Sequence, residues 1–203
     1  MKLYYSPGAC SLAPHIVLNE AGLAYETEKV DLATKKTATG GDFLAINPKG
    51  YVPAITLDDG QLLTEVQVLL RYVADQKPQS NLMPKPGTME RYRVEEWMNY
   101  IASELHKSYS PLFRPNTPEE YKTIVRGNLA KRLALLDQAL AGKQYLMGNA
   151  FTAADAYAFT ILRWSSFTKV DLSPYANIKA YMARMEARPK VQQTMKEEGL
   201  LGK

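Results

Sequence analysis

Sulfur and imidazole ligands are scarce in this sequence of 203 residues, which contains one cysteine, Cys10, and two histidines, His15 and His106. A single cysteine cannot form a disulfide within the chain, and a structural zinc site needs more ligands of these types. We therefore expect no metal cofactor. So little cysteine is typical of proteins from a reducing compartment, and we expect a cytoplasmic protein.

Long hydrophobic runs are absent as well. The N-terminal stretch of residues 3–19 carries no formal charge, but Pro7, Gly8 and Pro14 interrupt it, which excludes the continuous apolar core of a signal peptide. The best later candidate for a membrane span is interrupted by Asp155. We expect no association with a membrane.

Neither sign of charge dominates the sequence. It has 25 Lys and Arg against 21 Asp and Glu, a net charge of +4, and the basic residues are interspersed with acidic ones. Nucleic-acid binding usually needs a basic stripe, so we expect no nucleic-acid partner. Hydrophobic residues make up 46%, and 12 Gly with 12 Pro show no low-complexity bias, which indicates a globular protein of one large domain or two small ones.

The hydrophobic periodicity changes near residue 80. The segment 79–87 (QSNLMPKPG) is rich in turn-forming residues and indicates a domain boundary. Before it, the order βαβ and then ββα predicts an α/β domain with a mixed four-stranded sheet and helices packed on it. The predicted elements are a strand at residues 2–5, a helix at 11–21, a strand at 26–31, a hairpin of 52–57 and 61–64, and a helix at 65–76.

The pattern is helical throughout the second part of the chain. We expect residues 88–203 to form an all-α domain, separate from the α/β domain at 1–80. The helix starts carry recognisable capping signals. These are capping boxes at 117–120 and 152–155, with Thr117 and Thr152 as caps, a start at Ser173 and Pro174, and a last helix from Pro189 to Gly199.

The cysteine stands at a place that favours thiolate chemistry. Cys10 directly follows the strand at 2–5 and lies at the first turn of the helix predicted at 11–21. Backbone N–H groups and the helix dipole favour an anion there, so a thiolate is stabilised, whether it belongs to Cys10 or to a bound substrate. The alternative is that Cys10 is a small buried filler, as many cysteines are.

A strand, a thiol at a helix start, and Val52 with Pro53 before a hairpin follow one another as in a thioredoxin-like domain. Ala13 stands where a two-cysteine redox motif would have its second sulfur, which excludes a dithiol mechanism within one chain. We interpret His15, further along the same helix, as a packing or hydrogen-bonded structural residue, because no second metal ligand is near it in sequence.

The helix predicted at residues 90–109 has two different faces. One face is apolar, with Trp97, Met98, Ile101 and Leu105 at 3.6-residue spacing. The opposite face is mostly uncharged and hydrogen-bonding, and it carries Asn99, Ser103 and His106, with Lys107 beside them. Such a stripe is either a solvated surface or the wall of a site that faces the first domain.

Six segments together resemble the bacterial beta-class glutathione S-transferases, in the same order and at matching spacing along essentially the whole chain. They are residues 1–11 (MKLYYSPGACS), 47–53 (NPKGYVP), 59–65 (DGQLLTE), 104–107 (ELHK), 111–113 (PLF) and 151–155 (FTAAD). The resemblance implies a thioredoxin-like N-terminal domain, an all-helical C-terminal domain, and a cis peptide bond between Val52 and Pro53. It also implies a homodimer with one glutathione site in each subunit.

The resemblance further implies roles for single residues. Cys10 would lie next to the glutathione sulfur with Ser11 as the neighbouring hydroxyl, and His106 would be near enough to influence the thiol. Tyr5 is a lower-ranked partner of the thiol. The implied glutathione-binding residues are Lys35 for the glycyl carboxylate, the backbone of Val52 ahead of Pro53, Glu65 for the γ-glutamyl ammonium, the N–H groups of Val66 and Gln67 for the γ-glutamyl carboxylate, and Asn99, Ser103 and Lys107 from the second domain.

One position departs from the family pattern. After Glu65 the family usually has serine or another small residue, whereas this chain has Val66, which keeps the backbone N–H but lacks the hydroxyl. The loss of one hydrogen bond to a charged group weakens binding by about 1.5–3 kcal/mol. Glutathione affinity is therefore the property most affected by this difference.

Three functions follow from these observations. The first is conjugation, a detoxification reaction in which the thiolate of glutathione attacks a small hydrophobic electrophile. The second uses Cys10 itself, which would form a mixed disulfide with glutathione and carry out thiol-disulfide exchange, peroxide reduction or reductive dehalogenation. The third is a noncatalytic protein that binds glutathione or hydrophobic ligands.

Overall fold

Contacts between Cα atoms divide the chain into two units in the computed structural model, which describes residues 1–201. The first unit combines Met1–Met83 with the segment that begins at Arg188, and the second is Pro84–Ala187. The last helix thus belongs with the N-terminal unit by its contacts. The division into domains at residues 1–80 and 88–203 stays a prediction.

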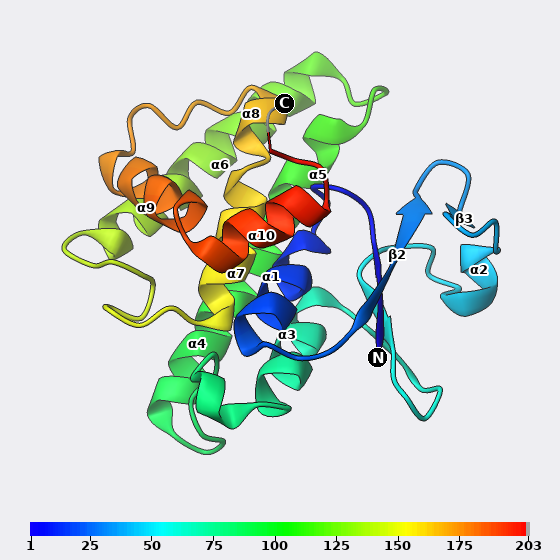
Figure 1. Cartoon of the computed structure of the whole chain (residues 1–203). Coiled ribbons are helices and arrows are strands. Elements are labelled where there is room, and N and C mark those ends of the chain that lie inside the picture. Colours follow the sequence, from blue (N-terminus) through cyan, green and yellow to red (C-terminus); the bar gives the residue numbers. More distant parts are fainter. Residues whose placement is uncertain (202–203) are drawn as a thin grey trace. The chain divides into compact units, whose positions relative to one another are not determined.

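The first unit contains the sheet and the helices that pack against it (Figure 1). In chain order its elements are β1 (Lys2–Tyr5), α1 (Leu12–Ala21), β2 (Glu26–Asp31), β3 (Lys36–Thr37), α2 (Phe43–Ile46), β4 (Ala54–Thr56), β5 (Leu62–Thr64), α3 (Val66–Asp75), the 3₁₀ turn η1 (Pro78–Ser80) and α10 (Pro189–Glu197).

The sheet is mixed, as predicted, but it has five strands in the order β3-β2-β1-β4-β5. β1 runs parallel to β2 and antiparallel to β4, and β4 and β5 form the predicted hairpin. The prediction of four strands was wrong because β3, which pairs antiparallel with β2, is only two residues long. Two residues are too few for an alternating pattern to be recognised in a sequence.

Apolar side chains cover both faces of this sheet. Tyr4, Val30 and Ala54 form one buried cluster with Phe43 of α2, and the rings of Tyr4 and Phe43 lie 5.6 Å apart. Successive side chains of a strand point to opposite faces, so Leu3, also fully buried, points to the other side. The middle of the central strand β1 is therefore buried on both faces, whereas β2 alternates between buried and exposed residues toward its end.

The C-terminal helix is fixed to the first helix by polar as well as apolar contacts. α10 packs against α1, as Figure 1 shows. The guanidinium of Arg188 donates two hydrogen bonds of 2.9 Å to the carboxylate of Glu20. The side chain of Asn19 donates to the hydroxyl of Thr194 at 2.9 Å. Residues almost 180 positions apart in sequence thus form one layer of the first unit.

The second unit is all-helical, as predicted. Its elements are α4 (Met89–Tyr100), the π-helical segment η2 (Ile101–His106), α5 (Lys107–Phe113), α6 (Glu119–Leu140), α7 (Ala153–Leu162), α8 (Ser165–Thr168) and α9 (Ala176–Glu186). Between residues 1 and 201, no helix is both long enough and apolar enough to cross a bilayer.

Three helices of the second unit differ from the prediction. The single helix expected at 90–109 is three successive segments, since the turn from Ile101 to His106 is π-helical and widens the spacing of side chains. α6 begins at Glu119 and its cap is Pro118, whose ψ of 142° is extended, so Thr117 is not the cap. α9 begins at Ala176, because the Asp171 carboxylate binds the backbone N–H of Ser173 at 2.8 Å and holds a turn there.

The second predicted capping box is confirmed at the start of α7. Asp155 is fully buried, and its carboxylate accepts hydrogen bonds from the backbone N–H groups of Thr152 at 2.8 Å and Leu146 at 2.9 Å. Burial raises the pKa of Asp155 to about 6, although these hydrogen bonds oppose the rise. Because the folded-state pKa lies above the unfolded value, the contribution of this group to stability decreases as the pH rises from about 4 to about 6.

We predict that Asp155→Ala lowers the free energy of unfolding by about 3 kcal/mol or more, because two buried N–H groups lose their acceptor. Asp171→Ala is the matched control: its carboxylate also binds a backbone N–H, but it is exposed, and we expect a loss below about 1 kcal/mol. Denaturant-induced unfolding of the full chain measures both variants. Equal losses would contradict the role assigned to the buried box.

Candidate functional site

The loop between β1 and α1 holds the cysteine in a defined turn. The backbone N–H of Ala9 donates to the carbonyl of Ser6 at 3.0 Å, and the Ser11 hydroxyl contacts both the N–H and the carbonyl of Ser6, at 3.1 and 3.2 Å. α1 begins at Leu12, one residue later than predicted, so Cys10 precedes the helix rather than standing in its first turn. Ser11 is fully buried and fastens this loop; its predicted catalytic role stays a prediction.

The cysteine lies beside the segment that precedes β4. Cys10 is half-buried, and its Sγ donates to the backbone carbonyl of Val52 at 3.2 Å. The peptide bond between Val52 and Pro53 is cis, which confirms the expectation from the resemblance. A thiol can donate this hydrogen bond and a thiolate cannot.

A basic side chain borders the same segment. Lys35 has a backbone φ of +58° in the turn before β3, and its Nζ donates to the carbonyl of Gly50 at 2.8 Å. The ammonium also lies 5.7 Å from the centre of the Tyr51 ring. The ammonium of Lys35 thus lies at Gly50, two residues before Val52, where it could bind a carboxylate.

An exposed carboxylate precedes α3. Glu65 adopts a φ of +72°, which residues other than glycine rarely do, and its Oε1 lies 2.6 Å from the ammonium of Lys49. The side chain of Glu65 makes no capping hydrogen bond to α3, whose first residue, Val66, is buried. Backbone N–H groups at the N-terminus of α3 therefore follow directly after the Glu65 carboxylate, which is paired with the Lys49 ammonium.

Tyr5, the lower-ranked candidate partner of a thiol, lies at the end of β1. Burial and then the carboxylates of Glu198 and Glu197 raise the pKa of Tyr5. Its ring centre is 5.7 Å from that of His15. The hydroxyl of Tyr5 thus stays protonated and can act as a hydrogen-bond donor.

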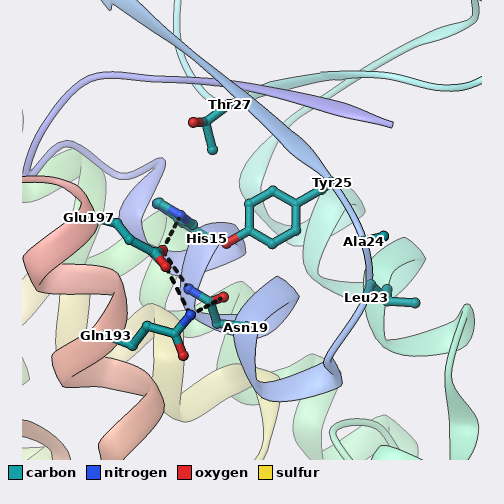
Figure 2. A pocket seen from close by; sticks show the side chains of 8 residues that line it. All are labelled: His15, Asn19, Leu23, Ala24, Tyr25, Thr27, Gln193 and Glu197. Atoms are coloured by element: carbon teal, nitrogen blue, oxygen red, sulfur yellow. Dashed lines mark hydrogen bonds and ion pairs between the residues drawn. The ribbon is translucent and has the colours of Figure 1, made fainter.

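His15 is a buried, hydrogen-bonded residue, as we interpreted it. Its Nδ1 lies 2.9 Å from Oε1 of Glu198, and its Nε2 lies 3.1 Å from Oε2 of Glu197, within ion-pair distance. Figure 2 shows this histidine at the wall of a pocket of about 410 Å³, with the ring of Tyr25 edge-on to it. Burial and the nearby Glu197 raise the pKa of Tyr25.

Glu197 and Glu198 differ in their surroundings. Burial raises the pKa of Glu197, but hydrogen bonds from Gln193 and Asn19 and the proximity of His15 lower it by more, so its pKa is below the ordinary value. Glu198 has a fully buried side chain. Its Oε2 accepts a hydrogen bond of 2.9 Å from the backbone N–H of Gly8, so its carboxylate joins the cysteine loop to α1.

Three of the four polar residues predicted in the second unit are exposed: Asn99 at the end of α4, Ser103 in η2 and Lys107 at the start of α5. The Ser103 hydroxyl donates to the carbonyl of Asn99 at 3.0 Å. His106 is half-buried, and its Nδ1 lies 2.7 Å from the Tyr157 hydroxyl. In the part of the chain that the structure describes, no three or more His, Cys, Asp or Glu side chains are grouped to hold a metal ion.

Two family models account for most of the chain. The glutathione S-transferase N-terminal domain matches residues 8–76, and the glutathione S-transferase C-terminal domain matches residues 100–189. The chain belongs to the glutathione S-transferase family. Its two matched segments correspond to the α/β part, with Cys10 and Val52, and to the helical part, with His106.

Individual relatives agree with this assignment. Glutathione S-transferase GstA of Escherichia coli O157:H7 is 50% identical over 200 residues, which cover 98% of this chain and 100% of the relative. BphK, a bacterial transferase solved as a ternary complex, has a TM-score of 0.97 at 50% identity, over 98% of this chain and 100% of its own. A sphingomonad glutathione S-transferase solved with glutathione has a TM-score of 0.95 at 46% identity, over 98% and 100%.

These similarities confirm the family and the combination of a thioredoxin-like and a helical part. Sequence reasoning missed three residues that the structure brings to the candidate site residues: Glu198 at the cysteine loop, Lys49 at Glu65, and Tyr157 at His106. Lys49 lies in the segment 47–53 that contributes to the resemblance, but nothing in the sequence indicates that Lys49 pairs with Glu65. Glu198 and Tyr157 lie 190 and 51 positions from the groups they contact, so no local pattern could have indicated them.

We predict that Glu198→Ala destabilises the protein by about 3 kcal/mol, because the partly buried Gly8 N–H and the buried His15 lose their shared acceptor. Hydrogen exchange of the amides of residues 6–11 should accelerate relative to the rest of the sheet. The control is Glu197→Ala, whose side chain is 39% exposed, and its effect should be smaller. A Glu198 variant with unchanged exchange in this loop would contradict the interpretation.

Proposed function

We propose that this protein binds glutathione through its first unit and conjugates the thiolate of glutathione to small hydrophobic electrophiles. The observation that carries the proposal is the contact of Cys10 with Val52, which places a half-buried thiol beside the backbone segment that precedes β4. The glutathione-bound sphingomonad relative supports the identity of the ligand. The roles of Asn99, Ser103, His106 and Lys107 in glutathione binding stay predictions.

The charges of the first unit are complementary to glutathione. The backbone N–H and carbonyl of Val52 would pair with the cysteinyl residue as one more strand beside the sheet. Lys35, which lies at Gly50, would hold the glycyl carboxylate. Glu65 would bind the γ-glutamyl ammonium in place of the Lys49 ammonium; this ion pair is exposed and therefore weak enough to be exchanged.

The γ-glutamyl carboxylate would bind at the N-terminus of α3. The backbone N–H groups of Val66 and Gln67 are the donors, and the positive end of the helix dipole adds to the attraction. Val66 keeps its N–H group, so this part of the site depends on the backbone alone. The absence of a hydroxyl at this position would weaken binding without removing it.

In the proposed reaction the thiol of glutathione loses its proton, and the sulfur forms a carbon–sulfur bond to the electrophile. With an activated chloroaromatic, chloride leaves with the electron pair of the broken bond, and the thiol proton passes to solvent. Hydrogen bonds to the thiolate lower the barrier because they stabilise the nucleophile at neutral pH. Cys10 would supply this stabilisation, and the influence of His106 on the thiol stays a prediction.

A second candidate function uses the sulfur of Cys10. The observation in its favour is that this thiol is only half-buried. Its thiolate would attack the glutathione sulfur of a mixed disulfide between glutathione and a small thiol, form a disulfide between Cys10 and glutathione, and release the small thiol as its thiolate. A glutathione thiolate would then attack the disulfide at Cys10, release the Cys10 thiolate and form glutathione disulfide.

We further propose a cytoplasmic homodimer. Large apolar or aromatic side chains are exposed in both units, namely Tyr51 and Val68 in the first and Met89 and Tyr92 in the second, and burial of such groups favours association. The cytoplasmic location rests on the single cysteine and is checked by cell fractionation. Light scattering of the purified protein is expected to give twice the chain mass of 22.8 kDa, and a monomer mass would contradict the dimer.

The full-length protein is expected to be retained on immobilised glutathione and to conjugate glutathione to an activated chloroaromatic. Cys10→Ala should keep part of the conjugation activity, because glutathione supplies the nucleophile. The same variant should lose disulfide exchange altogether. Conjugation that disappears together with exchange would favour the Cys10 reaction instead.

Glu65→Gln tests the binding site itself. We expect the dissociation constant for glutathione, measured by calorimetry, to rise by about tenfold or more, since a hydrogen bond to a charged group is lost. Glu96→Gln is the matched control, because Glu96 is also an exposed carboxylate in an ion pair, with Arg93. Retention of glutathione without turnover would indicate a binding protein, and no retention would contradict both enzymatic functions.

A further inference from the structure

The pocket beside His15 lies within the first unit and is distinct from the surroundings of Cys10. Its walls are α1, the segment that leads into β2, and α10. Tyr25 precedes β2, which starts beside the start of the parallel strand β1, whereas Cys10 follows the end of β1. The pocket therefore lies toward the other end of these strands, and it contains none of the candidate glutathione residues.

One carboxylate gathers the polar side chains at the wall of this pocket, as Figure 2 shows. Oε1 of Glu197 accepts a hydrogen bond of 2.9 Å from Gln193, and Oε2 accepts one of 2.8 Å from the buried Asn19. Oε2 also lies 3.1 Å from Nε2 of His15. Side chains of α1 and α10 thus hold the carboxylate in one orientation, while the Glu197 side chain stays 39% exposed at the pocket.

The charge at this wall is negative. Although burial opposes ionisation of Glu197, its hydrogen bonds and the proximity of His15 hold its pKa below the ordinary value, so it is ionised at neutral pH. The carboxylate of Glu198 lies 2.9 Å from the other ring nitrogen of His15. Two carboxylates thus flank one imidazole, and the three groups together are negative even when the imidazole is protonated. Such a wall attracts cations.

We propose that this pocket binds a small organic ammonium ion with an aliphatic or aromatic body. The ammonium would donate to the exposed side of the Glu197 carboxylate and lie against the ring of Tyr25, since aromatic rings attract cations. Leu23 and Ala24 also line the pocket and would contact the body of the ligand. The proposal goes beyond the proposed function and does not depend on it, because none of the candidate glutathione residues takes part.

The lining of the pocket favours this class of ligand over others. Between residues 1 and 201, no lysine or arginine lines the pocket, so an anion would meet the Glu197 carboxylate without a compensating charge. A divalent metal ion needs several oxygen, nitrogen or sulfur ligands, and the described residues contain no group of three or more His, Cys, Asp or Glu suited to one. The volume of about 410 Å³ suits a small molecule.

Benzylammonium is the probe that tests the site, and benzyl alcohol, which is similar in shape but uncharged, is the matched control ligand. Each is titrated into the ¹⁵N-labelled full-length protein without glutathione, and the amide signals report both the dissociation constant and the place of binding. We expect saturable binding of benzylammonium that shifts the amides of residues 23–27 and 193–197. Benzyl alcohol should bind at least about tenfold more weakly, because it lacks the charge. No binding of benzylammonium at millimolar concentrations, shifts confined to other residues, or equal binding of the alcohol would overturn the proposal.

Glu197→Gln tests the carboxylate. It keeps the size of the side chain and removes the charge, so we expect the dissociation constant for benzylammonium to rise by about tenfold or more. Glu104→Gln is the matched control, because Glu104 is also in an ion pair, with Arg132, and its side chain is 41% exposed. The control should bind benzylammonium as the unmodified protein does. Unchanged binding by Glu197→Gln, or an equal loss in both variants, would contradict the role of the pocket.

A second variant fills the pocket with a cation of the protein itself. Thr27 is exposed on β2 and lines the pocket, so Thr27→Arg should abolish the binding of benzylammonium. Thr123→Arg adds the same charge at an exposed position of α6 in the second unit and should leave binding unchanged. Neither threonine is buried, so both variants are expected to fold. Full binding of benzylammonium by Thr27→Arg would place the ligand elsewhere and overturn the proposal.

Discussion

The first unit depends on one buried carboxylate. Glu198 accepts hydrogen bonds from the backbone of Gly8 and from His15, so a single side chain near the end of the chain fixes both the cysteine loop and the helix that follows it. A buried charge is expensive unless it is fully hydrogen-bonded, and breaking one partner leaves the other uncompensated. The position of Cys10 therefore depends on the packing of α10 against α1, because this packing brings Glu198 to the cysteine loop. Local loop structure alone does not determine it.

In the second unit the comparable constraint is aromatic. The π-helical turn η2 brings His106 against Tyr157 and Trp164, where a uniform α-helix would have rotated it by a different angle. The buried rings of Tyr157 and Trp164 restrict the orientation of the His106 imidazole, and the Tyr157 hydroxyl contacts its Nδ1. The four polar residues predicted for one helix face thus differ in exposure. Asn99, Ser103 and Lys107 are exposed, whereas His106 is partly enclosed by side chains of its own unit.

Several features could be predicted because they depend on nearby residues. The alternation of residues 2–5 and 26–31 gave β1 and β2 within their observed bounds, and the box of Thr152 and Asp155 gave the start of α7. The strand β3 was not predicted, because a hydrophobic period cannot be recognised in two residues. The start of α6 was misplaced because an extended ψ at Pro118 cannot be distinguished in sequence from the first residue of a helix. The resemblance supplied the cis bond before Pro53, which no spacing argument would have justified.

By itself, the sequence determined the family, the mixed sheet followed by helices, and a lone thiol close to the start of the first helix, because these follow from short periods, capping signals and ordered motifs. Only the tertiary structure decided which partners these groups have: Val52 for Cys10, Lys49 for Glu65, Glu198 for Gly8, and Tyr157 for His106. The physical reason is that hydrogen bonds act over about 3 Å in space and are indifferent to separation along the chain. A partner many residues away leaves no local trace in the pattern of residues.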